Sequence, residues 1–266
     1  MKTILLTFDV EEFDYPGEKG IGISDNEMYK ISYKGLVNIL RLLGKHKLKA
    51  TFFVTASFAK RYPKLIKNMA RKHEIASHGY IHKHEYNNMS EKEAGLYLKK
   101  SKEILEKITK KKIYGFRAPR FSRPDIFAIK ESKFKYDSSI NPTYIPGKYN
   151  NFFSKRKLHK ENGLVIIPAS VTPLIRLPLF WIAFRNLGLG YGKLCTKLCF
   201  LMDDYVNLLF HPWEFVDVSK LKKLGLAVRG TGNRLVSILD DYIIWAKRNK
   251  YKFNTINNHL INKGFY

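Results

Sequence analysis

The sequence predicts an α/β fold built on a parallel sheet or barrel. Short apolar runs rich in Ile, Val, Phe and Thr alternate with amphipathic segments along the chain, a pattern typical of parallel strands joined by helices. The length of 266 residues suits one α/β barrel. Hydrophobic residues make up 45% and charged residues 27%, as in ordered globular proteins. No repeat or composition break divides the chain, so we expect a single domain over 1–266.

The predicted elements follow from these periodicities. About seven strands are expected, at residues 3–8, 50–54, 74–77, 113–116, 164–167, 205–210 and 252–255. Helices are expected at residues 33–43, 58–70, 91–108, 125–131 and 235–248. Ser90 followed by Glu93 is a capping-box pattern and places the start of the helix at 91. Residues 141–162 contain Pro142, Pro146 and Gly147 and predict a long irregular connection.

The charge balance predicts a strongly positive surface. Lys and Arg number 48 and Asp and Glu 23, which gives a net charge of +25 at pH 7 and favours anionic partners. Most of the lysines lie in helix-like stretches without the interleaved aromatic residues of a stacking surface, so nucleic acid is not expected as a partner. A peripheral contact with an anionic membrane surface or polymer stays open.

Other segments indicate a cytoplasmic protein. The apolar run at the N-terminus is short and is followed at once by acidic residues, unlike a signal peptide. Cys195 and Cys199 lie at helical spacing in an apolar segment and are expected to be buried, reduced thiols. The most apolar stretch, residues 173–184, is shorter than the roughly 20 residues that span a bilayer, but it would suit a shallow contact with one.

Candidate catalytic residues first occur directly after the first predicted strand, in residues 7–12 (TFDVEE). If the extended conformation persists, Asp9 and Glu11 point to the same side, because side chains two apart in a strand share a face. Two close carboxylates repel each other unless a cation or a proton lies between them. The pair therefore indicates either metal binding or general-base chemistry, and an acidic loop is the alternative interpretation.

A second cluster, residues 74–82 (EIASHGYIH), contains two histidines that follow another predicted strand. His78 and His82 are four residues apart, and on one helical turn both imidazoles would lie on the same side, as metal binding requires. Two histidines and one carboxylate would leave a coordination position for water. A His-x-x-x-His pair also arises by chance on protein surfaces, so alone it is weak evidence.

Two further clusters follow strands near the same expected edge of the sheet. Arg117 lies in residues 115–122 (GFRAPRFS), where a cation beside a carboxylate would keep it ionised and oriented. His211 lies in residues 207–215 (NLLFHPWEF), where an imidazole next to a rigid proline could act as a general acid near neutral pH. The alternatives are a surface arginine before a turn and a packed histidine.

Together these clusters resemble the polysaccharide deacetylases, the NodB-homology enzymes of carbohydrate esterase family 4. The resemblance covers nearly the whole chain and is closest to the branch whose first motif is Asp-Val-Glu. The matching segments are residues 6–12, 50–54, 75–82, 114–122, 136–140 and 211–215, with weaker similarity at 168–170, 188–191 and 229–235. The resemblance implies a distorted (β/α) barrel that hydrolyses the N-acetyl group of an amino sugar in a polysaccharide or saccharide intermediate.

The resemblance also implies roles for individual residues. Asp9 corresponds to the catalytic base, Arg117 to the residue that orients it and His211 to the acid. His78 and His82 correspond to ligands of a divalent metal ion, with zinc as the expected ion. In the commonest family pattern a second aspartate follows the base and binds metal, whereas Val10 stands at that position here.

The residue that completes the metal site is therefore open at this stage. Strand alternation favours Glu11, since Glu12 or Asp14 would need a bulge or loop to reach the same position. The side chains expected to contact the N-acetylated sugar are Pro119, Phe121, Tyr191 and Trp213. For the three aromatic residues, packing in the core is an equal alternative.

Two other functions fit the same sequence. Relatives of this family open small cyclic amides or ureides, so an amidohydrolase of the same fold is one alternative. The other is a non-catalytic basic protein that binds an anionic polymer or membrane, which an intact set of chemical residues argues against.

Overall fold

The structure is a computed structural model that describes residues 2–146 and 149–266. The chain divides into two compact units, each made of two stretches of sequence. The first unit comprises Met1–Ala50 and Ser170–Asn254, and the second comprises Thr51–Ala169 and Thr255–Tyr266. The expectation of one catalytic domain over 1–266 stays a prediction, and the two units are described in turn.

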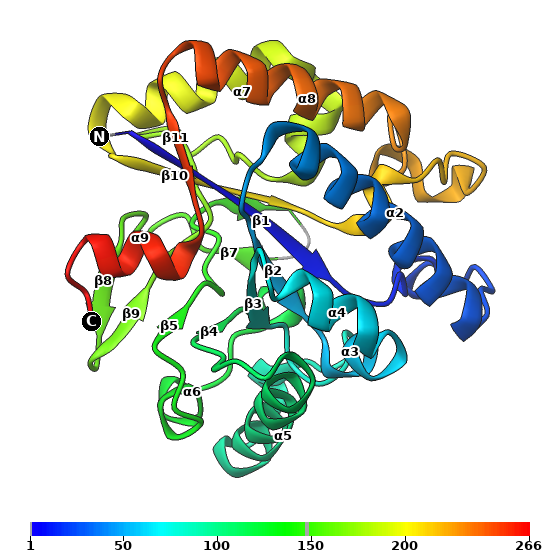
Figure 1. Cartoon of the computed structure of the whole chain (residues 1–266), viewed down its shortest axis with the longest axis vertical. Coiled ribbons are helices and arrows are strands. Elements are labelled where there is room, and N and C mark those ends of the chain that lie inside the picture. Colours follow the sequence, from blue (N-terminus) through cyan, green and yellow to red (C-terminus); the bar gives the residue numbers. More distant parts are fainter. Residues whose placement is uncertain (1, 147–148) are drawn as a thin grey trace. The chain divides into compact units, whose positions relative to one another are not determined.

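The first unit is organised around strand β1 (Thr3–Val10), every residue of which is buried. Strand β10 (Tyr205–Phe210) pairs with it in parallel, with Phe8 opposite Phe210. Strand β11 (Lys252–Asn254) also pairs with β1 in parallel, starting with Thr3 opposite Lys252 (Figure 1). Because β1 and β10 are buried and parallel, they are nearly continuous apolar runs in the sequence. This arrangement places the residues after β1 and those after β10 at the same end of the two strands.

Helices cover this part of the sheet. Helix α2 packs against helix α8, and α8 packs against α7, which also contacts β10. Ser24 caps the first turn of α2 by accepting a hydrogen bond from the Glu27 N–H. Gly188, with φ of 79°, interrupts the helical backbone of α7. The helical elements of this unit are α1 (Tyr15–Glu18), α2 (Asp25–His46), α7 (Trp181–Met202), η3 (Pro212–Phe215), η4 (Lys222–Ala227) and α8 (Asn233–Arg248).

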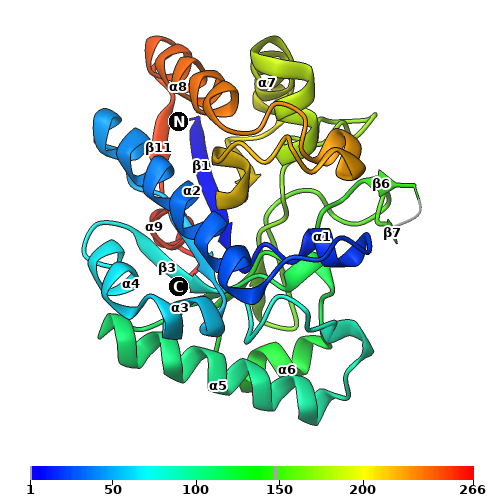
Figure 2. The ribbon, with the colours of Figure 1, turned by 90° about the vertical axis from the view of Figure 1, so that its right-hand side faces the viewer.

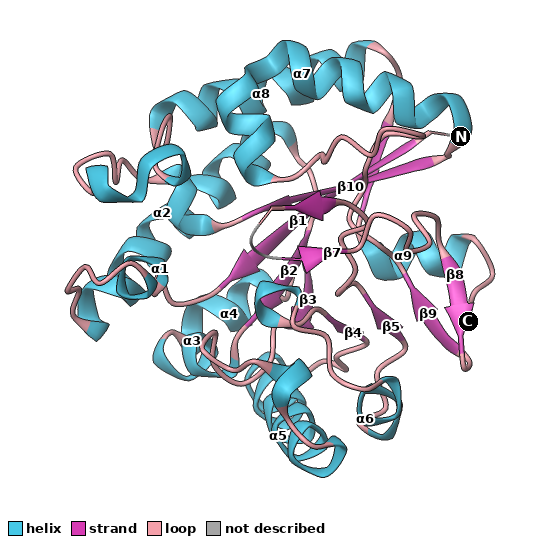
Figure 3. Ribbon diagram, turned by 180° about the vertical axis from the view of Figure 1, so that it is seen from behind, coloured by secondary structure: helices cyan, strands magenta, loops and turns pink. Residues whose placement is uncertain are grey.

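The second unit contains strands in the order β2-β3-β4-β5-β9-β8. The pairs are parallel except for the hairpin of β8 and β9, which lie side by side in Figure 3. A separate antiparallel pair is formed by β6 and β7. The strands are β2 (Thr51–Val54), β3 (Glu74–Ser77), β4 (Gly115–Phe116), β5 (Tyr136–Asp137), β6 (Tyr144–Ile145), β7 (Tyr149–Asn150), β8 (His159–Glu161) and β9 (Leu164–Ile166).

The helices of the second unit connect successive strands. The Ser90 hydroxyl accepts a hydrogen bond from the Glu93 N–H and caps α5, which packs along α6 (Figure 2). Helix α9, at the C-terminal end, begins after the cap residue Thr255. The helical elements are α3 (Ala56–Arg61), α4 (Pro63–Met69), η1 (Tyr86–Asn88), α5 (Glu91–Thr109), η2 (Pro119–Phe121), α6 (Ile126–Glu131) and α9 (Ile256–Asn262).

All seven predicted strands are present, and most differences from the sequence prediction concern boundaries. The helix predicted at 33–43 begins earlier, at Asp25. The helix predicted at 58–70 is two helices, because Pro63 starts a new one and lacks the N–H to continue the first. The connection at 141–162 contains only the short strands β6, β7 and β8 where it is described, and Gly147 lies outside the described residues.

Two predictions concern the apolar residues 173–184 and the two cysteines of α7. Cys195 and Cys199 are buried thiols, as expected. Within residues 2–146 and 149–266, no helix combines the length and apolar character needed to cross a bilayer.

Candidate metal and active site

Four carboxylates lie at or just beyond the end of β1, and all four are buried. Asp9 is on the strand, and Glu11, Glu12 and Asp14 follow it. Burial of an ionised carboxylate is costly unless a cation or hydrogen-bond donors compensate for the lost water. An acidic surface loop, the alternative interpretation of this segment, would leave these side chains in solvent. Their burial instead fits a functional cluster.

His78 is the first residue after β3, and its ring is held by the backbone of a neighbouring segment. The Nδ1 atom lies 2.9 Å from the Arg117 carbonyl oxygen. A carbonyl can only accept a hydrogen bond, so Nδ1 carries the proton and Nε2 keeps its lone pair in the neutral ring. This arrangement is typical of metal-binding histidines, whose second nitrogen donates to a backbone carbonyl or carboxylate.

The expectation that His78 and His82 share a helical turn is wrong. Both lie in the loop that follows β3, and their rings face each other with centroids 6.0 Å apart and planes 21° apart. Gly79 makes the turn, with φ of 77°, a left-handed conformation that favours glycine. The Tyr86 side chain packs over this turn and accepts a hydrogen bond from the Tyr80 N–H at 3.0 Å. The loop, rather than a helix, therefore brings the two imidazoles together.

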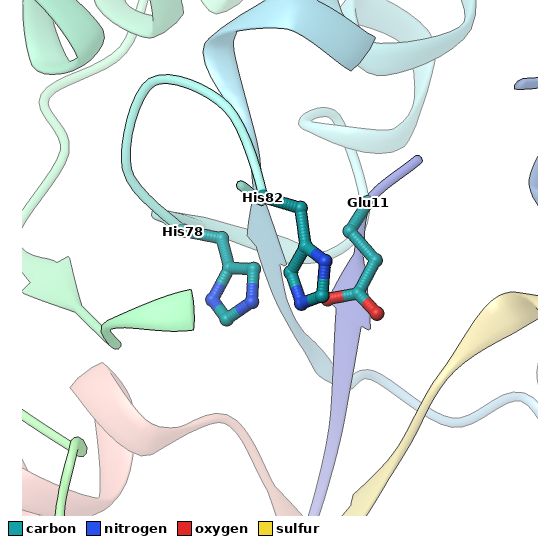
Figure 4. Close-up of side chains that lie close together, drawn as sticks. All are labelled: Glu11, His78 and His82. Carbon is teal, nitrogen blue, oxygen red and sulfur yellow. The ribbon is translucent and has the colours of Figure 1, made fainter. Parts of the chain in front are cut away.

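Glu11, His78 and His82 form a group that could hold a metal ion (Figure 4). One ligand atom from each residue can be chosen so that all three lie within 4.8 Å of one another. Figure 4 shows the carboxylate and the two imidazoles lying close together. Among the four buried carboxylates, the one in this group is Glu11, as strand alternation favours, rather than Glu12 or Asp14.

The chemistry of this donor set fits a divalent transition metal. Two neutral imidazole nitrogens and one carboxylate oxygen are common zinc ligands, with bonds of about 2.0–2.2 Å. Three ligands from the protein leave a position for water, as in catalytic rather than structural zinc sites. The identity of the metal is not set by these residues alone, since imidazole also suits other divalent ions.

Arg117 is fully buried in the second unit, immediately after β4, so the interpretation as a surface arginine is wrong. Its Nη2 donates to the Ser138 hydroxyl at 2.9 Å, and its Nε to the Ser138 carbonyl at 3.2 Å. Its guanidinium carbon lies 4.1 Å from the centroid of the Phe53 ring. These contacts fix the guanidinium, while the Arg117 carbonyl oxygen orients His78. The side chain of Arg117 therefore contacts Ser138 and Phe53, whereas its main chain binds His78.

His211 follows β10 and is bound to a buried ion pair. Its Nδ1 lies 3.1 Å from Glu214 Oε1, which also accepts a hydrogen bond from the His211 N–H at 2.7 Å. The other carboxylate oxygen, Oε2, accepts a hydrogen bond from Arg185. Arg185 and Glu214 are both fully buried. The opposite ring nitrogen of His211, Nε2, lies 4.0 Å from Glu11 Oε1.

The surroundings of His211 raise its pKa above the usual value. Burial acts in the opposite direction and is the largest single effect, because it disfavours the charged imidazolium. The negative charge of Glu11, the hydrogen bond and charge of Glu214 and the charge of Asp9 together outweigh it. The neighbouring carboxylates therefore favour the charged imidazolium more strongly than in a free histidine.

Arg185 and Glu214, which hold His211 in place, are not predicted from the sequence. Glu214 lies inside the HPWEF segment, three residues after His211, and this spacing could have suggested a partner for the imidazole. Arg185 lies on α7, far from His211 in the sequence, and only packing reveals its contact. Its Nε donates to the Arg229 carbonyl at 2.8 Å, so the guanidinium is held on several sides.

The four predicted sugar-contacting residues have different surroundings. Trp213 is buried and stacks on Phe13, with ring centroids 4.7 Å apart, in a hydrophobic cluster of the first unit. The Tyr191 hydroxyl donates to the Pro178 carbonyl at 2.8 Å. Pro119 is buried and Phe121 partly exposed, both in η2. Phe121 and Tyr191 retain exposed surface that a sugar could contact, and the role of all four stays a prediction.

A family model described as polysaccharide deacetylase matches residues 1–137. Among curated proteins, a peptidoglycan-N-acetylglucosamine deacetylase of Bacillus cereus is 33% identical over 104 residues. This match covers 39% of the present chain and 35% of the relative, so it spans about a third of that protein.

Solved structures resemble the whole chain at low sequence identity. PuuE allantoinase has a TM-score of 0.67 and 17% identity, covering 99% of this chain and 91% of its own. A pseudoenzyme of carbohydrate esterase family 4 from Bacillus anthracis has a TM-score of 0.55 and 17% identity, covering 97% of this chain and 64% of its own. The predicted α/β fold of the distorted-barrel type is thereby confirmed.

Proposed function

Because the chain belongs to the polysaccharide deacetylase family, we propose that it is a metal-dependent hydrolase that removes N-acetyl groups from an amino sugar. The substrate would be a polysaccharide or a saccharide intermediate. The observation that carries the proposal is the grouping of Glu11, His78 and His82, whose ligand atoms lie within reach of one cation. A buried carboxylate, Asp9, and a partly buried imidazole, His211, accompany Glu11 in the first unit.

Glu11, His78 and His82 would hold the ion, and zinc is the expected metal. A divalent ion bound there would supply a water of lowered pKa and polarise the acetyl carbonyl. The hydrogen bond from His78 Nδ1 to the Arg117 carbonyl supports this assignment, because it leaves Nε2 as the metal-binding atom.

Asp9 is the proposed general base. It lies on β1, two residues before Glu11, a spacing that places two side chains on one face where the backbone stays extended. With Glu11 committed to the metal, Asp9 is left to accept a proton from the attacking water. The assignment of Arg117 as the residue that orients Asp9 rests on the family resemblance and stays a prediction.

His211 is the proposed general acid. An amide nitrogen leaves far more readily once it is protonated, so the reaction needs a donor on the leaving-group side. Glu214 fixes the ring through Nδ1, which directs Nε2 as the donor atom. The charge of Glu214 also favours the protonated ring that a donor requires.

The test is to separate metal binding from turnover with single substitutions. In His78→Ala and His82→Ala, both bound zinc and acetate release from N-acetylglucosamine oligomers should be lost. In Asp9→Asn, zinc should stay bound while turnover falls by roughly 10²–10⁴, the usual contribution of a general base. Metal content by atomic absorption and acetate release provide the two measurements. Full activity in metal-stripped His82→Ala would refute the metal site.

A second candidate is an amidohydrolase acting on a small cyclic amide or ureide. The similarity of the fold to PuuE allantoinase favours this alternative, because it extends over almost the whole of both chains. The same metal-bound enzyme should then open a ring such as that of allantoin and leave N-acetylated oligomers intact. A zinc-loaded preparation that acts on neither substrate class would support the third interpretation, a non-catalytic binding protein.

A further inference from the structure

A hydrogen-bonded loop of the first unit presents two aliphatic side chains at its tip. Thr172 and Leu177 close the loop, with the Thr172 N–H donating to the Leu177 carbonyl at 2.9 Å. The Leu177 N–H in turn donates to the Thr172 hydroxyl at 3.0 Å. Between them, Leu174 is 86% exposed and Ile175 is 65% exposed. Leucine at position 174 even adopts a positive φ of 62°, a conformation in which Gly or Asn is usual.

The second half of α7 continues the exposed apolar surface. Cys195 and Cys199 lie on its buried face. On the outward face, Leu194 is 56% exposed and Leu201 is 76% exposed, seven residues apart and therefore on one side of the helix. Met202, next to Leu201, is 57% exposed. A solvent-facing stripe of a helix is normally polar, so leucines at these positions require an explanation.

The charged residues of the loop and of α7 are all basic. Residues 163–202 contain no Asp or Glu, and two partly exposed acidic residues, Asp203 and Asp204, follow directly after Met202. Lys197 lies on the outward face of α7 between the two leucines, and Lys193 is partly exposed beside them. The chain as a whole carries a net charge of +25. The surface thus combines exposed aliphatic side chains with cations.

We propose that the tip of loop 172–177 and the outward face of the second half of α7 form a docking surface for an anionic lipid bilayer. Aliphatic side chains would enter the boundary between headgroups and acyl chains, and the lysines would contact the anionic headgroups. Tyr191 ties the helix to the loop, since its hydroxyl donates to the Pro178 carbonyl. The proposal does not depend on the hydrolase function.

The charge distribution favours a bilayer over a second copy of the chain. A symmetric dimer would bring the same patch of each copy together, and Lys193 and Lys197 would then face identical cations. Two copies with a charge of +25 each also repel one another. An anionic bilayer complements both the charge and the apolar character.

The proposal is tested by co-sedimentation of the full chain with phosphatidylglycerol–phosphatidylcholine vesicles. We expect wild type to bind these vesicles and to bind pure phosphatidylcholine vesicles much more weakly. The loop variant Leu174→Ser/Ile175→Ser and the helix variant Leu194→Gln/Leu201→Gln should each bind at least tenfold more weakly. All of these side chains are exposed, so circular dichroism and thermal unfolding should show unchanged folding.

Matched controls separate this surface from general effects of composition. Leu96 on α5 is 63% exposed, and Leu96→Gln should leave vesicle binding unchanged. Lys193→Gln/Lys197→Gln should weaken binding by about fivefold per lysine, because each basic residue at an anionic surface contributes about 1 kcal/mol. Lys64→Gln/Lys67→Gln, which removes two exposed lysines of α4, should weaken it less.

Four outcomes would overturn the proposal. The first two are wild type that does not bind anionic vesicles at low salt, and wild type that binds neutral vesicles equally well. The third is loop and helix variants that bind as strongly as Leu96→Gln. The fourth is a wild-type dimer in sedimentation velocity that the helix variant disrupts without any effect on vesicle binding, which would make the face an interface between copies.

Discussion

At the scale of single residues, the most consequential unpredicted feature is the buried pair of Arg185 and Glu214 behind His211. Removing two charges from water is expensive, and their attraction repays this cost only when further hydrogen bonds satisfy both groups. The guanidinium donates to Glu214 and to the Arg229 and Ala227 carbonyls, and the carboxylate binds both the ring and the N–H of His211. The pair therefore couples the stability of this region to the orientation of the proposed acid.

We predict that Arg185→Met destabilises the protein by about 3–5 kcal/mol, because it leaves the Glu214 carboxylate buried without its cation. Chemical denaturation would measure this loss. The double variant Arg185→Met/Glu214→Gln should recover part of it, since the uncompensated charge is gone. Arg229→Met, which changes an exposed arginine, should have little effect. If the double variant lost as much free energy of unfolding as the two single variants together, this explanation would be contradicted.

The choice among the acidic residues after β1 is a second question at this scale. Glu11 has a ligand atom near those of His78 and His82, whereas Glu12 and Asp14 are not part of that group. We predict that Glu11→Ala lowers zinc affinity by at least tenfold, while Glu12→Ala lowers it by much less. Competition with a chromogenic chelator would measure both affinities. The reverse order would assign the metal to Glu12.

At the scale of elements, the loop after β3 depends on one glycine. A Cβ atom at Gly79 would lie 2.7 Å from the Tyr86 hydroxyl oxygen, in addition to the strain of its positive φ. Gly163 has a similar φ of 81° with nothing within 4 Å of such an atom. An alanine at Gly163 would therefore show the effect of backbone strain alone, whereas an alanine at Gly79 would show backbone strain together with a steric clash.

We predict that Gly163→Ala costs about 1–2 kcal/mol, the usual strain of a left-handed conformation, and that Gly79→Ala costs more. Gly79→Ala should also weaken zinc binding, because His78 and His82 flank the displaced turn. Thermal unfolding and chelator competition would measure the two effects. Equal stability losses, with zinc affinity unchanged in both variants, would show that the turn tolerates the added atom.

Within the second unit, the Glu74 carboxylate connects helix α9 to the sheet. This group accepts hydrogen bonds from Thr51, Tyr136 and the Asn257 N–H at the start of α9. Burial raises the pKa of Glu74, and these hydrogen bonds offset the effect only in part. The carboxylate thus joins two strands and a helix that lie far apart in the sequence.

We predict that Glu74→Ala destabilises the protein by about 3 kcal/mol through unsatisfied buried donors and increases hydrogen exchange in α9. A raised pKa means that the folded state binds the proton more tightly than the unfolded chain. The stability advantage of wild type over the variant should therefore be greatest below about pH 4 and decrease as pH rises. Glu103→Ala, an exposed change on α5, should show neither effect. A pH-independent difference would contradict the assigned shift.

At the scale of the whole molecule, strands were easier to predict than the contacts between distant segments. Buried parallel strands are visible as apolar runs, and all seven expected ones are present. Strand β5 was not predicted, because a strand of two residues is too short to show a periodicity. Helix α7 was not predicted, because leucines occupy exposed positions and remove the alternation of apolar and polar faces that marks a helix in a sequence.

In the candidate site too, residues near strand ends were predictable and contacts between distant segments were not. Parallel strands place the residues at their carboxyl ends at one edge of a sheet. Asp9 lies near the end of a strand, and the other predicted site residues follow strands: Glu11, His78, His82, Arg117 and His211. The helical interpretation of the two histidines failed because spacing alone does not distinguish a helix from a loop turned by Gly79. The contact of Arg185 with Glu214 depends on how α7 packs, which no local pattern encodes.

The net charge of +25 gives a final prediction for the molecule as a whole. Excess positive charge destabilises a compact state by self-repulsion, and the unfolded chain relieves this by separating the charges. Salt screens the repulsion, with a Debye length of about 10 Å at 0.1 M. We therefore expect the melting temperature to rise by several degrees between low salt and about 0.2 M sodium chloride. An uncharged osmolyte at equal osmolarity should have a smaller effect, and a melting temperature that falls with salt would show that attractive ion pairs outweigh the excess of cations.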